Sequence, residues 1–423
     1  MRQSMLVRGA VAAASASLIL TACGSEPDQP EAGSARAGSD LAAEAGSTEV
    51  DGPSPRLVLA DADSGRVDIV DLTTEESLHS FEFEDATRLT TVNDRYVYAV
   101  NGKGNVAHVL EPGSWTIDHG DHTHSYTKDP TELGKLEGVK PAHVITGDRK
   151  VTTFFDGEGK AEVNTFGELS DGNADAEFSI AADAPQHGVA IPVDDHFLVS
   201  HSTTNPDDTR PGSFELRDAR GEIVKTFGTP CPRMHGTAAF DKYAVAACDD
   251  GLFVASTDGT EWRSEKVPYP EGITPESRPT TFREQDSVPV LAATAGPAAT
   301  NDGILAFDSA TRGWTHIRTP DRALDVNLSG DGKTVFAVLA DGTFRSYDVA
   351  TAAETASAQA LSEPFDWSDT SQAKPSVLVS GKRAYVSDPA GSRVQEIDYR
   401  DNARIARTLD AGFTVGSMSV VGE

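Results

Sequence analysis

The sequence lacks several features that mark common classes of protein. Basic residues are scarce: 36 lysines and arginines stand against 66 aspartates and glutamates, a formal net charge of −30, which repels DNA and RNA. The Gly-x-Ser-x-Gly motif that presents a serine nucleophile in many hydrolases is absent. Only four methionines are present, too few for a thioether cluster that would hold Cu(I). We therefore expect no nucleic-acid partner and no serine-hydrolase chemistry.

Helical periodicity is also nearly absent. Short apolar or alternating segments recur instead, separated by Asp, Gly, Asn and Pro, and this pattern is typical of an all-β repeat protein. The clearest repeat has strand patterns at 324–328, 334–338 and 343–348, with a last one after Ala350. Such a unit is one four-stranded antiparallel blade of a β-propeller.

Eight segments align with the second strand of this repeat, spaced by about 40 to 55 residues. The sequence therefore predicts a single all-β propeller over residues 55–423 with eight blades. Seven blades are the alternative, because 276–301 has weak strand patterning. The first repeat has no inner strand of its own, and the C-terminal segment 414–421 is expected to supply it and close the ring. The aligned second strands are 56–60, 96–100, 151–155, 197–201, 243–247, 288–292, 335–338 and 384–387.

The N-terminus has the features of a lipoprotein signal. Residues 1–22 carry two arginines and then an apolar stretch too short to span a membrane. The sequence Leu-Thr-Ala-Cys ending at Cys23 predicts cleavage and lipidation there, with an ordinary secretory signal as the alternative. Residues 23–54 have almost no large apolar side chain, which predicts a lipidated, disordered tether. We expect an exported monomer at the outer face of the cytoplasmic membrane, in the periplasm or at the cell surface, held there by its lipid alone.

Two cysteines remain once Cys23 is assigned to the lipid. Cys231 and Cys248 form an even pair in a protein expected to reach an oxidising compartment, and this predicts a disulfide between them. The alternative is a Cys/His metal site that includes His235.

Three of the 11 histidines fall at the same place in successive repeats. His143, His187 and His235 each stand at the start of an inner strand, separated by 44 and 48 residues. Inner strands line the channel of a propeller and begin on one face, so these imidazoles should meet at the channel mouth. Imidazole is a preferred ligand of zinc. Asp325 holds the equivalent position in the seventh repeat and is a weaker candidate ligand.

A second group of histidines lies in the run 118–124. His122 and His124 form His-x-His, which projects two imidazoles to one side of an extended segment. His119 and Asp121 are further candidates, either as ligands or as partners that orient the other rings. The run precedes the third repeat, so it either completes one site with the channel histidines or forms a second site. Zinc is the expected metal, although copper and nickel also bind imidazole.

Four stretches together resemble the AztD-type zinc metallochaperones. They are 115–124 (Trp-Thr-Ile-Asp-His-Gly-Asp-His-Thr-His), 140–143 (Lys-Pro-Ala-His), 186–188 (Gln-His-Gly) and 234–237 (Met-His-Gly-Thr). The resemblance extends over 55–423. It implies an exported, non-catalytic propeller that binds zinc and delivers it to the solute-binding protein of a zinc ABC transporter. Members of that family can carry a His-rich motif near the mature N-terminus, whereas residues 24–54 contain no histidine.

Two other functions fit a propeller with these residues. A propeller hydrolase or lactonase would use His143, His187 and His235 around a channel metal and keep a fourth position open for water. A scaffold propeller would bind another protein, and its histidines would have no metal role. Metal-dependent turnover would indicate the first, and partner binding by metal-free protein would indicate the second.

Overall fold

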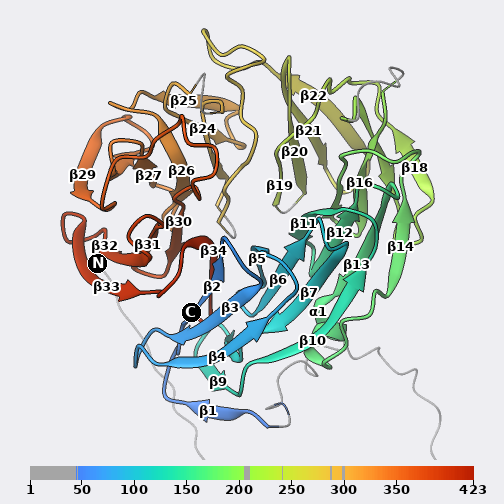
Figure 1. Ribbon diagram of the computed structural model, residues 1–423. Helices are drawn as coiled ribbons and strands as arrows, with labels where there is room; N and C mark the ends of the chain where they lie inside the picture. The colour runs from blue at the N-terminus through green and yellow to red at the C-terminus, as the bar shows by residue number, and fades with distance from the viewer. Residues whose placement is uncertain (1–43, 45, 204–209, 241, 286–287, 298–300) are drawn as a thin grey trace, which may run out of the picture. The chain divides into compact units, whose positions relative to one another are not determined.

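The computed structural model describes residue 44 and residues 46–203, 210–240, 242–285, 288–297 and 301–423 (Figure 1). The chain divides into two units, 1–39 and 40–423, and the following concerns the second. The predicted signal peptide, the lipidated Cys23 and the tether up to residue 43 lie outside the described residues and stay predictions. No helix in the described part of the chain has both the length and the hydropathy needed to cross a membrane.

Almost every element of this unit is a β-strand, and the predicted all-β propeller is confirmed (Figure 1). The single described helix, α1 (Phe166–Ser170), follows β13. In order of hydrogen-bonded neighbours, the blade sheets are β34-β2-β3-β4 (Val415–Val421, Arg56–Asp61, Arg66–Asp71, Ser77–Glu82), β5-β6-β7-β10 (Arg88–Val92, Tyr96–Asn101, Val106–Glu111, Thr131–Glu137), β11 to β14 (Pro141–Gly147, Lys150–Phe155, Lys160–Thr165, Phe178–Ala181), β15 to β18 (Ala190–Val193, His196–His201, Ser213–Arg217, Ile223–Thr226), β19 to β22 (Thr237–Phe240, Tyr243–Cys248, Gly251–Thr257, Trp262–Val267), β23 to β25 (Val290–Thr294, Ile304–Asp308, Gly313–Ile317), β26 to β29 (Ala323–Leu328, Thr334–Leu339, Thr343–Asp348, Glu354–Gln359) and β30 to β33 (Val377–Ser380, Arg383–Asp388, Arg393–Asp398, Arg404–Asp410).

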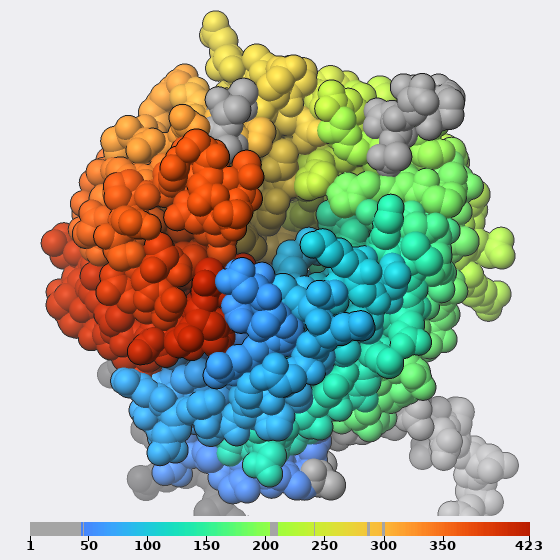
Figure 2. Space-filling view, in the orientation of Figure 1, coloured from blue at the N-terminus to red at the C-terminus, as the bar shows by residue number. Residues whose placement is uncertain are grey.

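The second strand of most sheets is deeply buried. Every residue of β6 is buried, whereas β4, the outermost strand of its sheet, is largely exposed. Neighbouring sheets cover both faces of a second strand. Its sequence is therefore a continuous apolar run instead of an alternation of apolar and polar residues. The core consists of the layers between adjacent sheets. For example, Phe214 of one sheet meets Phe253 of the next with ring centroids 4.8 Å apart. The face of the propeller that Figure 2 turns toward the viewer is hollowed near its middle.

Two features bear on the expected eight blades and their closure. β34 pairs with β2 from Arg56↔Val421 to Asp61↔Val415, which is the pairing that closure by the C-terminal strand requires. The sheet β23 to β25 has three strands, and its inner position holds only an isolated bridge between Arg283 and Ala292. This is the segment with weak strand patterning in the sequence. Pro279 and Pro289 flank the bridge and have no N–H to give to a ladder.

A further sheet is added outside the blades. β8 (Ser114–Asp118) and β9 (Thr123–Thr127) form a hairpin inserted between β7 and β10, and β1 (Thr48–Val50) pairs with β9. The predicted disordered tether is therefore too long at its C-terminal end, because β1 lies within it. Composition missed this strand because polar contacts hold the segment: Glu44 forms ion pairs with Arg95 at 2.6 Å and with Lys128 at 3.2 Å.

Candidate metal-binding sites

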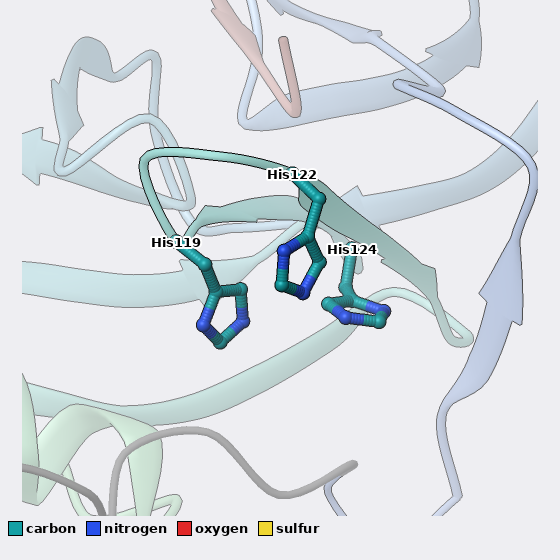
Figure 3. Close-up of side chains that lie close together, drawn as sticks. All are labelled: His119, His122 and His124. Carbon is teal, nitrogen blue, oxygen red and sulfur yellow. The ribbon is translucent and has the colours of Figure 1, made fainter. Parts of the chain in front are cut away.

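The tip of the β8–β9 hairpin carries three histidines, His119, His122 and His124, called here the hairpin cluster (Figure 3). Their ring centroids lie 4.8 to 5.2 Å apart. A tight turn brings them together, since the His119 amide donates to the His122 carbonyl at 2.9 Å. One nitrogen from each ring lies within 4.8 Å of the others. His119, a weaker candidate from the sequence, is thus placed equally with the other two.

Carboxylates orient two rings of the hairpin cluster. Asp121 Oδ1 lies 2.7 Å from His122 Nδ1, and Glu49 Oε1 of β1 lies 2.6 Å from His124 Nδ1. Each contact leaves the Nε2 atom of the ring available for a metal. The His122 side chain is 55% exposed and that of His124 is 35% exposed, so the hairpin cluster is open to solvent. No sequence pattern pointed to Glu49, because it lies in the segment predicted to be disordered.

The second group, called the channel cluster, consists of His143, His187 and His235. His143 is in β11, while His187 and His235 stand just before β15 and β19, so three successive sheets each contribute one ring. The two Nε2 atoms of His143 and His187 are 3.2 Å apart. The ring centroids are separated by 4.7, 5.2 and 5.8 Å. The predicted convergence of these three side chains is what the structure shows.

Local backbone features place these rings. The ladder between β11 and β12 shifts register between Pro141 and His143, which turns the His143 side chain relative to the rest of the strand. Gly236 follows His235 with φ +87°, and a Cβ there would lie 2.7 Å from the carbonyl carbon of Thr280. Glycine is therefore required beside His235, because any side chain would push away the backbone that His235 contacts.

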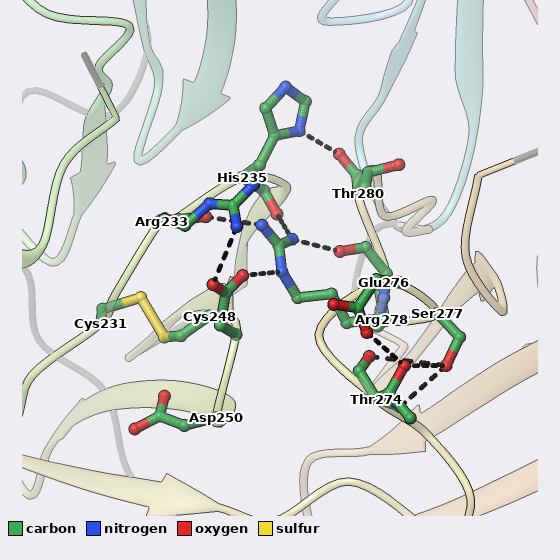
Figure 4. A network of polar contacts seen from close by, with 12 residues as sticks. Cys231, Arg233, His235, Cys248, Asp250, Thr274, Glu276, Ser277, Arg278 and Thr280 are labelled. Atoms are coloured by element: carbon green, nitrogen blue, oxygen red, sulfur yellow. Dashed lines mark hydrogen bonds and ion pairs between the residues drawn. A yellow bond between two sulfur atoms is a disulfide. The ribbon is translucent and has the colours of Figure 1, made fainter. Parts of the chain in front are cut away.

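The disulfide between Cys231 and Cys248 is present, as predicted (Figure 4). Both cysteines are fully buried. Their sulfurs are bonded to each other, so the alternative of a thiolate site with His235 does not apply. Cys248 ends β20, and the bond ties the loop before His235 to that strand. Closing a loop of this length contributes about 3 kcal/mol in the chain-entropy model.

Hydrogen bonds fix the orientation of two rings in the channel cluster. Asp156 Oδ2 lies 2.6 Å from His187 Nδ1, and His235 Nδ1 donates to the Thr280 carbonyl at 2.6 Å (Figure 4). With Nδ1 so engaged, the Nε2 lone pair of each ring is free for a metal. A carboxylate or carbonyl behind a metal-binding imidazole is the usual supporting arrangement. Sequence analysis missed Asp156 and Thr280, although Asp156 directly follows the predicted strand 151–155.

Burial keeps two rings of the channel cluster, those of His143 and His235, uncharged. It lowers the pKa of His143 well below its usual range, and the positive charges of His187, His235 and Arg88 add to the effect. Burial also lowers the pKa of His235, opposed in part by the hydrogen bond to Thr280. These two rings are therefore neutral at pH 7, and a cation need not displace a proton from them.

The two clusters are separate, so the alternative of one shared site is wrong. The hairpin leaves the second sheet at its Thr131↔Glu111 end. Arg88, at the opposite end of that sheet, donates a hydrogen bond to the Ala142 carbonyl, next to His143. A six-residue strand measures about 17 Å between its first and last Cα. The run 118–124 was expected in a connection between repeats, but β10 follows it and keeps it at the other end of the sheet.

Asp325 belongs to neither cluster. Its register matches that of His143, since a shift precedes each residue in its inner strand. However, its carboxylate accepts from Arg283 Nη2 at 3.0 and 3.1 Å and from the Val377 amide at 3.1 Å. The repeat position was predicted correctly. The assignment of Asp325 as a metal ligand is corrected, because its carboxylate is bound by Arg283.

The sequence and the fold were both compared with those of known proteins. No protein-family model matches the chain. The zinc chaperone AztD of Citrobacter koseri is 26% identical over 353 residues, which cover 81% of each protein. A crystal structure of Citrobacter koseri AztD has a TM-score of 0.78 at 24% identity, covering 88% of this chain and 98% of that one. The dihydro-heme d1 dehydrogenase NirN has a TM-score of 0.56 at 13% identity, covering 87% and 75%, and shares the fold alone.

Proposed function

Because the resemblance to AztD-type zinc chaperones is confirmed, we propose that this chain is a zinc-binding metallochaperone that works outside the cytoplasm. One observation carries the proposal: His143 Nε2 and His187 Nε2 stand 3.2 Å apart. A tetrahedral zinc with Zn–N bonds of about 2.05 Å spaces its nitrogen ligands about 3.3 Å apart. His235 offers a third nitrogen within 4.8 Å of both.

The two clusters suit different steps of zinc handling. The channel cluster is half-buried, and hydrogen bonds hold two of its rings, which favours firm retention. The hairpin cluster is exposed on a turn, where another protein has access to it. We propose that the hairpin cluster captures or hands over zinc and the channel cluster stores it. The recipient in this proposal is the solute-binding protein of a zinc ABC transporter, reached from a lipid anchor at Cys23.

Zinc stoichiometry of variants tests this proposal. Mass-spectrometric metal analysis of the mature protein should give two zinc ions per chain. The double variant His143→Ala/His187→Ala should retain one, bound at the hairpin. His79→Ala is the matched control, since His79 lies on the exposed strand β4 in neither cluster, and it should retain both. Full zinc content in the double variant would remove the basis of the proposal.

Delivery needs a separate experiment. Zinc-loaded protein is mixed with metal-free solute-binding protein and the two are separated before metal analysis. The proposal expects zinc to move to the acceptor faster than it moves to a chelator of equal affinity. Removal of the three hairpin histidines should slow this movement and leave zinc in the channel cluster. Equal rates to acceptor and chelator would show passive release instead of delivery.

One observation favours a second candidate, a zinc hydrolase. Within the described residues, the channel cluster has three histidines and no fourth His, Cys, Asp or Glu ligand. Three protein ligands and one open position are typical of catalytic zinc. Zinc-loaded protein should be tested on lactones and esters. Turnover that disappears in His143→Ala/His187→Ala would establish the enzyme, and rates equal to those of that variant support the chaperone.

A further inference from the structure

A zinc ion held by the channel cluster would lack a fourth ligand and a negative charge to balance its own. Three neutral imidazoles bring no charge to a Zn²⁺ ion, and tetrahedral zinc needs a fourth ligand. Asp156, whose carboxylate contacts the cluster, is engaged with His187 Nδ1. It therefore acts through the ring and contributes one negative charge at most.

A cation with no ion pair among the described residues lies beside this position. Arg88 begins β5, and its guanidinium donates to the Ala142 carbonyl, adjacent to His143. In the described part of the chain, no carboxylate lies within ion-pair distance of Arg88, although the protein has 66 acidic residues. A guanidinium has five N–H donors in a planar fork, so donors remain after the bond to Ala142.

Arg88 and two other arginines place positive charge near the channel cluster. Its charge reaches the cluster, because it helps to lower the pKa of His143. Burial lowers the pKa of Arg88, an effect opposed in part by the negative charge of Asp156, and Arg88 is exposed to solvent at the start of β5. Arg278 and Arg210 add positive potential at His235, although Arg278 is paired with Asp249 at 2.9 Å. A divalent cation at the channel cluster is thus joined by the nearby positive charge of Arg88.

We propose that Arg88 and the metal held by the channel cluster form a two-point site for a carboxylate. One carboxylate oxygen is the fourth metal ligand, and the other accepts hydrogen bonds from the Arg88 guanidinium, which matches a carboxylate in geometry. This inference rests on the proposed function and deepens it. The carboxylate belongs either to a small organic acid or to an Asp or Glu side chain of the protein that receives the zinc.

Cobalt spectroscopy tests the site directly. Co²⁺ replaces zinc in a variant whose three hairpin histidines are alanine, so that only the channel cluster is occupied. Its visible absorption reports the number and type of ligands. Titration with acetate should change the spectrum with saturation, whereas acetamide, which has no charge, should not. The variant Arg88→Gln should weaken acetate binding at least about tenfold without weakening Co²⁺ binding measured without acetate, since a nearby positive charge has been removed.

The control and the outcomes separate this inference from the proposed function. Arg66→Gln is the matched control, because Arg66 is an exposed arginine paired with Asp68 at 2.6 Å, and it should leave acetate binding unchanged. If Co²⁺ fails to bind the channel cluster at all, the proposed function and this inference both fall. If Co²⁺ binds but acetate leaves its spectrum unchanged, or Arg88→Gln binds acetate as well as the parent does, only the carboxylate site is overturned.

A second titration identifies the source of the carboxylate. An amidated peptide with one glutamate is compared with acetate in the same cobalt-loaded protein. A spectral change with both, dependent on Arg88, supports a side chain of the acceptor protein. A change with acetate alone supports a small organic acid, because the channel then excludes a peptide.

Discussion

Asp156 offers the sharpest test of how the channel cluster is held. Its Oδ2 lies 2.6 Å from His187 Nδ1, and it fixes the tautomer that leaves Nε2 free for zinc. Loss of such a supporting partner lowers metal affinity about 10- to 100-fold. Asp156→Asn keeps an acceptor and loses the charge, so we expect a fall of about tenfold, or 1.4 kcal/mol. Asp156→Ala loses both, and we expect about 100-fold.

The assay is competition for zinc with a chromophoric chelator, in protein lacking the hairpin histidines. Glu132→Gln is the matched control, because Glu132 Oε1 lies 2.7 Å from His108 Nδ1 in a histidine–carboxylate pair outside both clusters. This control should bind zinc as the parent does. If both Asp156 variants bind zinc within about twofold of Glu132→Gln, the orientation of His187 does not govern affinity and the reasoning from geometry is refuted.

Three further perturbations have expected outcomes. Glu49→Gln should weaken zinc binding at the hairpin cluster about tenfold and leave the channel cluster unchanged, as a two-site zinc titration would show; equal loss at both sites would contradict separate clusters. The folded pKa values of His143 and His235 lie below their unfolded values near 6.5, so the stability of metal-free protein should decline as pH falls below about 6.5. A Tm series from pH 7.5 to 5 should show a smaller decline in His143→Ala, and an equal decline would exclude this cause. Replacing Cys231 and Cys248 by serine should cost about 3 kcal/mol, and an unchanged denaturation midpoint would refute a structural role for the bond.

The fold was predictable because each repeat carries the same local signals. Second strands are apolar runs bounded by turn residues, and seven of the expected eight agree with the strands of the structure within about one residue at each end. The remaining one, at 288–292, begins later, at Val290, because Pro289 cannot donate to the ladder. The strand β1 was missed, since its order depends on partners far away in the sequence.

The candidate sites were predictable only where the repeat itself carries the residues. His143, His187 and His235 converge because successive sheets present equivalent positions. The same reasoning placed Asp325 correctly on its strand, but it had no means of detecting that Arg283 binds the carboxylate. The run 118–124 was misplaced because the sequence does not reveal that β10 follows the hairpin instead of preceding it.

Anomalous diffraction at the zinc absorption edge, from crystals of the zinc-loaded protein, tests the central claim most directly. We expect a peak about 2.0–2.1 Å from the Nε2 atoms of His143, His187 and His235. The absence of a peak at these three rings, with zinc present elsewhere in the crystal, would contradict the claim that the propeller holds its cargo in the channel.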